Sequence, residues 1–142
     1  MLTLPHNLID GWEVLLIDDE DDSLAVAEII LSEYGAKVYL ASDGQQALDL
    51  LETIHPKFII SDLSMPVLDG WGFIHALRLN RRYDDIPVIA LTAHAMRGDR
   101  ERGLAAGFHN YLTKPLTVDT FMHDLVTLLV DIPGLAQELA LN

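Results

Sequence analysis

The stretch FIISDLSMP, residues 58–66, determines how the rest of the chain is interpreted. An apolar run that begins at Phe58 leads to a single acidic residue, Asp62, and a loop that contains Pro66 follows at once. A short apolar run bounded by turn residues is typical of a strand buried on both faces, as in a parallel sheet. A carboxylate at the point where such a strand surfaces is either a turn residue or a reactive group.

Similar runs and helical patterns lie on both sides of this stretch. Apolar runs predict strands at 13–17, 37–41, 57–61, 86–92 and 108–113. Apolar residues at helical spacing predict helices at 22–34, 43–54, 71–82, 97–107 and 117–130. Strands that alternate with helices across short connections predict a doubly wound α/β fold. We expect a five-stranded parallel sheet with five helices, of the flavodoxin-like type with strand order 2-1-3-4-5.

The length of 142 residues suits a single domain with a hydrophobic core. We expect an N-terminal arm over residues 1–12 and the domain over 13–130. A C-terminal tail over 131–142 is expected to form a short helix or to begin a linker. No apolar run approaches the ~20 residues of a membrane-spanning helix, and the first residues lack the features of a secretory signal.

Composition excludes several classes of function. The net charge of −13 disfavours direct binding to the phosphate backbone of nucleic acids and to anionic membrane surfaces. The chain has no cysteine, which excludes disulfides and thiolate metal sites and fits the reducing cytoplasm.

The residues at the predicted strand ends form the candidate site, because ligands of a doubly wound sheet bind beyond the carboxyl ends of its strands. These ends carry Asp18 and Asp19, Asp62, Thr92 and Ala93, and Lys114. Two carboxylates ~4 Å apart repel each other by about 4 kcal/mol at an effective dielectric constant of ~20. A divalent cation relieves this repulsion, and oxygen ligands with retained water are typical of Mg²⁺. The strand ends therefore predict a magnesium site.

The same residues suit phosphoryl transfer. Carboxylates form aspartyl-phosphate intermediates in several classes of enzyme, and Asp62 is the candidate nucleophile. Lys114 supplies positive charge for one phosphate oxygen, and the Thr92 hydroxyl and the Ala93 backbone N–H supply hydrogen bonds to the others.

Each of these residues also has an ordinary structural interpretation. Asp18 and Asp19 are suited to capping the helix that begins near residue 22, and Asp62 is suited to a turn. Lys114 alone is typical of a solvated surface lysine, and Thr92 alone is typical of a strand. Separate structural roles do not explain why acids, a hydroxyl and an amine all fall at strand ends, so a shared site is favoured.

Four motifs resemble those of the receiver domain of two-component response regulators. They are LLIDDE at 15–20, IISDLSMPVLDGW at 59–71, IPVIALTA at 86–93 and YLTKP at 111–115. The resemblance extends from about Val14 to Leu129 and is strongest to single-domain regulators and the receivers of hybrid kinases. Many DNA-binding regulators carry GADDYLxKPF where this chain has GFHNYLTKPL, which argues against their salt-bridged dimer.

The resemblance implies a role for each site residue. Asp62 is the expected phosphoacceptor. Mg²⁺, or Mn²⁺ as a substitute, is expected to bind Asp19, Asp62 and the backbone carbonyl of Ser64, with Asp18 acting through a water molecule. Lys114 is expected to bind the phosphate, and the peptide bond that follows it is expected to be cis.

The resemblance also implies a conformational switch. Thr92 moves toward the phosphoryl group and Tyr111 turns inward, which alters the surface formed by the fourth helix, the fifth strand and the fifth helix. Ser64 and His94 occupy positions expected to tune dephosphorylation.

The expected partners are proteins. The phosphodonor is a histidine kinase or a histidine phosphotransfer protein, and the target is a downstream protein, with a homodimer left open. No direct nucleic-acid or membrane contact is expected, and the expected location is the cytoplasm. The chain is expected to take part in its own phosphorylation and slow autodephosphorylation without being an enzyme for a separate substrate.

Three other functions fit less well. A magnesium-dependent phosphatase with an aspartyl nucleophile usually has a second acid two residues later, where this chain has Ser64. A receiver that binds partners without phosphorylation would be favoured by a missing acid or a missing lysine, and here none is missing. A dinucleotide-binding unit needs a glycine-rich turn after the first strand, where this chain has the acidic run DDEDDS at 18–23.

Overall fold

Short apolar strands form the centre of the molecule. The computed structural model describes residues 4–93 and 99–140. Its strands are β1 (Glu13–Ile17), β2 (Lys37–Ala41), β3 (Phe58–Asp62), β4 (Val88–Thr92) and β5 (Asn110–Thr113). Every residue of β3 is buried, and in β1 and β4 only one end residue is not. This is the pattern of strands that are covered on both faces.

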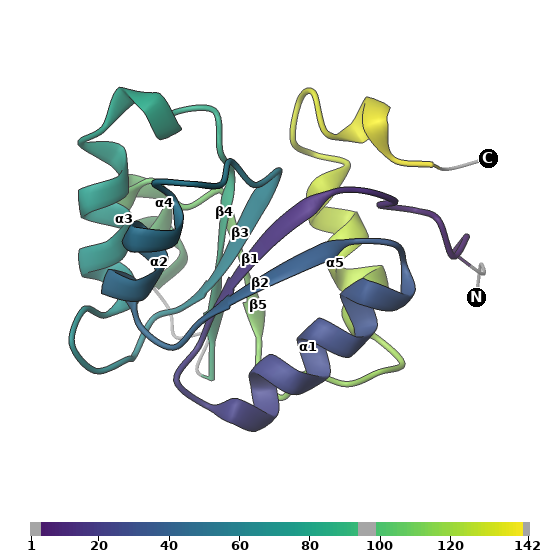
Figure 1. The fold of residues 1–142 in the computed structure, drawn as a ribbon, viewed down its shortest axis with the longest axis horizontal. Coiled ribbons are helices and arrows are strands. Elements are labelled where there is room, and N and C mark those ends of the chain that lie inside the picture. Colours follow the sequence, from purple (N-terminus) through teal and green to yellow (C-terminus); the bar gives the residue numbers. More distant parts are fainter. Residues whose placement is uncertain (1–3, 94–98, 141–142) are drawn as a thin grey trace.

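The strands form one parallel sheet in the order β2-β1-β3-β4-β5 (Figure 1). The predicted flavodoxin-like order is therefore confirmed. The chain passes from β1 outward to β2 and then back across to β3, so the order reverses between β1 and β3. The carboxyl ends of these two strands border the crevice in which such sheets bind ligands.

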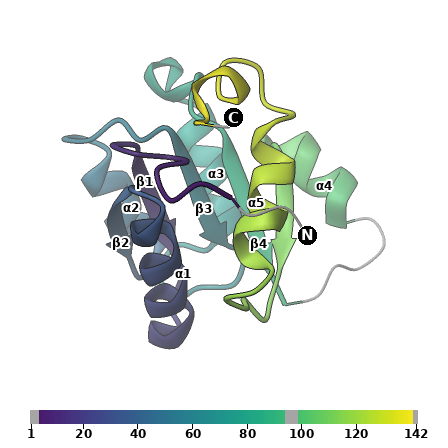
Figure 2. The same ribbon diagram turned by 90° about the vertical axis from the view of Figure 1, so that its right-hand side faces the viewer.

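Helices cover both faces of the sheet. They are α1 (Asp21–Glu33), α2 (Gly44–Leu50), α3 (Gly70–Arg78), α4 (Asp99–Ala106) and α5 (Phe121–Leu129), with 3-10 helices η1 (Arg81–Tyr83) and η2 (Ala136–Glu138). Figures 1 and 2 show α1 and α5 on one face and α2, α3 and α4 on the other. None of the helices in the described ranges is long and apolar enough to cross a membrane.

Side-chain caps fix where two of these helices begin. The Asp43 carboxylate accepts a hydrogen bond from the backbone N–H of Gln46 at 2.9 Å, immediately before α2. The Asp69 carboxylate accepts one from Gly72 at 2.8 Å, immediately before α3. Aspartate at this position satisfies one of the backbone donors that a helix leaves unpaired at its start.

The hydrophobic core consists of two clusters, one on each face of the sheet. On β1, Leu16 points to the cluster under α1 and α5, whereas Leu15 points to the cluster under α2 and α3. On β3, Ile60 and Ile59 divide in the same way. Successive strand residues point to opposite faces, so each strand contributes to both clusters.

The two ends of the described chain pack against each other beside the α1–α5 face (Figure 1). Leu8 and Ile9 are buried in the same cluster as Leu135 and Leu139. The backbone N–H of Ala140 donates a hydrogen bond to the carbonyl of Leu8 at 3.1 Å. Apolar side chains from the segments before β1 and after α5 thus enlarge the core cluster on this face of the sheet.

Candidate functional site

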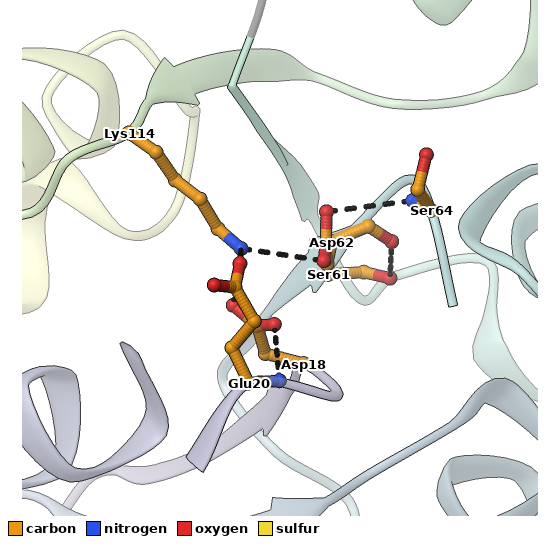
Figure 3. Close-up of polar contacts among 6 residues, drawn as sticks. All are labelled: Asp18, Glu20, Ser61, Asp62, Ser64 and Lys114. Carbon is orange, nitrogen blue, oxygen red and sulfur yellow. Dashed lines mark hydrogen bonds and ion pairs between the residues drawn. The ribbon is translucent and has the colours of Figure 1, made fainter. Parts of the chain in front are cut away.

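The carboxyl ends of three strands bring a lysine and acidic side chains together (Figure 3). Asp18 directly follows β1, Asp62 is the last residue of β3, and Lys114 directly follows β5. β1 and β3 are neighbours in the sheet, whereas β4 lies between β3 and β5. Residues that are far apart in the sequence therefore meet at one edge of the sheet.

Lys114 is the positive centre of this group. Its Nζ lies 3.0 Å from Asp18 Oδ2 and 3.3 Å from Asp62 Oδ2, and it also forms an ion pair with Glu20 Oε1. Burial alone lowers the pKa of Lys114. Close polar contacts with Glu20 and Asp18, together with the charges of Asp18 and Asp62, outweigh burial and raise the pKa. Lys114 is therefore protonated at neutral pH.

Glu20 belongs to this cluster although its position in the sequence did not single it out. Carboxylate oxygens of Asp18, Glu20 and Asp62 lie within 4.8 Å of one another. Asp19, the acid expected to bind metal directly, lines the adjacent cavity but is not among these oxygens. The turn after β1 explains the difference, because Asp18 Oδ1 accepts a hydrogen bond from the Glu20 backbone N–H at 3.0 Å. This turn places the side chain of Glu20 next to Lys114.

Asp62 is enclosed by its own loop and is 6% exposed. Its Oδ1 accepts a hydrogen bond from the backbone N–H of Ser64 at 3.4 Å. Burial and then the negative charge of Asp18 raise the pKa of Asp62 to about 6, against the opposing effects of Lys114 and the Ser64 N–H. The charged form of this carboxylate therefore gains from any further cation at the site.

The surroundings of Asp18 show whether the site suits a metal ion. It is 2% exposed, and its Oδ2 has no partner with hydrogen-bond geometry among the described residues. A buried carboxylate oxygen requires a compensating charge, which Lys114 supplies here. Asp18, Glu20 and Asp62 provide only oxygen ligands, the kind that Mg²⁺ prefers. The donor set therefore fits a magnesium ion.

A cavity of about 280 Å³ opens beside these groups and is lined by Asp19, Glu20, Asp62, Leu63, Ser64, Thr92, Ala93 and Lys114. Thr92 ends β4 and Ala93 follows it, so both residues expected to contact phosphate border the cavity. Ser64 is exposed at the same opening. The cavity therefore combines positive charge, a hydroxyl and backbone donors next to Asp62.

Of the residues expected to take part in switching and tuning, Tyr111 is described by the structure and His94 is not. Tyr111 lies on β5 opposite Ala90 of β4, and is half-buried against the cluster that faces α2 and α3. His94 lies outside the described residues. The peptide bond between Lys114 and Pro115 is cis, which confirms the prediction made from the resemblance.

Comparisons with known proteins agree with this geometry. Residues 14–126 match the family model of the response regulator receiver domain. The structure is similar to the chemotaxis response regulator CheY4 of Vibrio cholerae, with a TM-score of 0.78 and 30% identity over 84% of this chain and 99% of that chain. It is also similar to the receiver domain of the sensor histidine kinase PA1611 from Pseudomonas aeruginosa, which has a magnesium ion coordinated in its active-site cleft. That match has a TM-score of 0.73 and 37% identity over 82% of this chain and 96% of that one.

Curated relatives include short and long proteins. An uncharacterised 14.6 kDa protein of Leptolyngbya boryana is 39% identical over 104 residues, which are 73% of this chain and 79% of that protein. The response regulator Rre1 of Synechocystis is 38% identical over 75% of this chain and 46% of its own length. The sensor histidine kinase GacS of Pseudomonas protegens is 35% identical over 73% of this chain and 12% of its own length. The chain therefore spans less than half the length of the two longer relatives.

Proposed function

Because this chain belongs to the family of response regulator receiver domains, we propose that Asp62 accepts a phosphoryl group from a phosphohistidine donor and that this modification switches a protein-binding surface. The observation that carries the proposal is the contact of Lys114 with both Asp18 and Asp62 beside one cavity. This arrangement combines a nucleophile with the positive charge that an incoming phosphoryl group requires.

Asp62 acts as the nucleophile in this proposal. One of its carboxylate oxygens forms a bond to phosphorus while the P–N bond of the phosphohistidine breaks and its electron pair leaves with the imidazole. Lys114, 3.3 Å from Asp62 Oδ2, stabilises an oxygen of the transferred group. The Thr92 hydroxyl and the Ala93 backbone N–H border the cavity and supply hydrogen bonds to the other oxygens.

The proposed cofactor is Mg²⁺, with Mn²⁺ as a substitute. Asp19, Asp62 and the backbone carbonyl of Ser64 are the proposed direct ligands, and Asp18 acts through a water molecule. The carboxylate of Glu20 belongs to the same group of oxygens. When bound, the divalent ion offsets the negative charges of the carboxylates and of the phosphoryl group. The magnesium ion in the active-site cleft of the PA1611 receiver supports Mg²⁺ as the cofactor.

Phosphorylation is proposed to act as a switch because it adds about two negative charges and new acceptor oxygens to Asp62. Thr92 moves toward these oxygens, Tyr111 turns inward, and the surface of α4, β5 and α5 changes its affinity for a partner. Ser64 and His94 tune the slow autodephosphorylation that ends the signal. The chain thus acts on its own phosphoryl group and not on a separate substrate.

The proposed partners are a histidine kinase or histidine phosphotransfer protein as phosphodonor and a downstream protein as target, in the cytoplasm. The net charge of −13 argues against nucleic acid or an anionic membrane as a direct partner. A second copy of the chain is a further candidate for the switched surface, and sedimentation before and after phosphorylation tests it.

Labelling with acetyl phosphate and Mg²⁺ tests the proposed function. The wild-type chain is expected to gain a single phosphoryl group by intact-mass measurement, and Asp62→Asn is expected to gain none. Asp49→Asn, a change of an exposed acid on α2, is the control and is expected to label like the wild type. Chelation of the metal is expected to abolish labelling. Undiminished labelling of Asp62→Asn would refute the proposal.

A further inference from the structure

The ion pair between Glu20 and Lys114 is a contact that the proposed phosphoryl transfer does not use. Glu20 is the N-cap residue of α1, but its side chain makes no capping hydrogen bond. The carboxylate is turned toward the Lys114 ammonium instead (Figure 3). An acid in this position would ordinarily stabilise the start of the helix. Its orientation therefore points to a role in the site.

Lys114 is shared between acids in very different surroundings. The side chains of Asp18 and Asp62 are 3% and 9% exposed, whereas that of Glu20 is 61% exposed. An exposed ion pair adds little to the stability of a fold, because water screens the charges and two side chains lose freedom. The main consequence of the Glu20 contact is therefore its effect on the position of the Lys114 ammonium and not on stability.

We propose that Glu20 is a positioning residue that holds Lys114 toward the turn between β1 and α1 and competes with a phosphoryl group on Asp62 for the ammonium. This inference rests on the proposed function of Asp62. In the resting site, the ammonium lies 3.3 Å from Asp62 Oδ2 while it also contacts Glu20. New phosphoryl oxygens on Asp62 attract the same ammonium. If the ammonium moves toward these oxygens, its contact with Glu20 weakens. The free energy lost from that contact opposes phosphorylation.

The pair Glu20→Gln and Asp21→Asn isolates this effect. Both substitutions remove one negative charge from the same acidic run, but Asp21 is exposed and is not among the described partners of Lys114. At saturating Mg²⁺, the rate constant for labelling by acetyl phosphate is expected to be about two- to five-fold higher in Glu20→Gln than in Asp21→Asn, the range for a partly exposed ion pair. Equal rate constants would overturn the proposal.

A Lys114→Met background tests whether Glu20 acts through Lys114. Once the ammonium is gone, Glu20→Gln and Asp21→Asn are expected to change the rate constant for labelling by the same factor. If Glu20 acts through Lys114, removal of Lys114 also removes the specific effect of Glu20. A larger effect of Glu20→Gln in this background would show that Glu20 acts directly on the metal or the phosphodonor, and would overturn the positioning role.

A second readout needs neither metal nor phosphodonor. In chelated protein, the NMR signal of the Lys114 ammonium is expected to shift, and its hydrogen exchange with water to accelerate, in Glu20→Gln but not in Asp21→Asn. An unchanged signal in Glu20→Gln would overturn the proposed contact even if Asp62 is labelled normally. Failure of the wild-type chain to take any label would instead contradict the proposed function itself.

Discussion

Lys114 Nζ lies 3.3 Å from Asp62 Oδ2, although β4 separates the two strands that lead to these residues. The same ammonium lies 3.0 Å from Asp18 Oδ2. Lys114 thus pairs with carboxylates of the acidic cluster that fits a divalent cation. A lysine and a metal ion that draw on the same carboxylates weaken each other's binding, which makes the position of the ammonium a central property of this site.

Replacement of the lysine tests this competition. Lys114→Met is expected to bind Mg²⁺ roughly tenfold more tightly than the wild type, because the ammonium no longer pairs with the carboxylates and no longer repels the ion. Isothermal titration calorimetry measures the affinity. Lys57→Met removes a lysine that pairs with Glu138 at 2.8 Å and is expected to leave the affinity unchanged. Unchanged or weaker binding by Lys114→Met would contradict the competition.

The raised pKa of Asp62 predicts a pH-dependent gain in stability from Asp62→Asn in chelated protein. In the folded wild type the pKa of Asp62 is raised to about 6, against 3.8 for an aspartate in an unfolded chain. Ionisation of Asp62 therefore removes stability from the wild type as the pH rises between these values, and the asparagine of the variant makes no such contribution. The free energy of unfolding of Asp62→Asn is expected to exceed that of the wild type by about 3 kcal/mol above pH ~6, and to match it below pH ~4. Urea denaturation measures this, and a variant less stable than the wild type at neutral pH would contradict it.

The sequence was sufficient to predict the positions of Asp62 and Lys114, because parallel strands place their carboxyl ends at one edge of a sheet. It was not sufficient to predict the ion pair between Glu20 and Lys114. That depends on the turn in which Asp18 accepts a hydrogen bond from Glu20, and a run of acids contains no signal that distinguishes one member from the next.

The contact between the two ends of the described chain was also not predicted from the sequence. Apolar residues in the tail predicted a short helix or a linker, and the structure has the single turn of η2. The burial of Leu139 depends on Leu8, and no local periodicity connects segments so far apart. Packing between distant segments depends on the whole fold, so local sequence patterns do not predict it.

The close approach of Gly70 to Asp62 predicts a strong effect of a single methyl group. A Cβ at Gly70 would lie 2.2 Å from the Asp62 backbone oxygen and 2.8 Å from Leu63 Cα. Gly70→Ala is therefore expected to lower the free energy of unfolding by about 2–3 kcal/mol. The matched control is Gly103→Ala in α4, where the nearest atom would be Phe108 Cδ2 at 3.7 Å. This control is expected to gain up to about 1 kcal/mol. Equal unfolding midpoints for the two variants in urea would contradict the argument.

The buried leucines of the tail predict that the folding unit includes the segments on either side of residues 13–130. Leu139 is 7% exposed, and Leu139→Ala is expected to cost about 2–3 kcal/mol of unfolding free energy. Leu79 is 74% exposed, and Leu79→Ala is expected to cost less than about 0.5 kcal/mol. Thermal and urea denaturation compare the two variants. A tail that does not contribute to folding would leave both as stable as the wild type.

The position of the phosphoryl group is the most direct test of the account. Borohydride reduces an aspartyl phosphate to homoserine and leaves an unmodified aspartate intact. After labelling with acetyl phosphate and Mg²⁺, reduction and digestion, peptide mass spectrometry is expected to find homoserine at position 62 and unchanged aspartate at positions 18 and 19. A labelled chain in which Asp62 remains unreduced, with the phosphoryl group on another residue, would contradict the proposal that the lysine and acids at this sheet edge make Asp62 the acceptor.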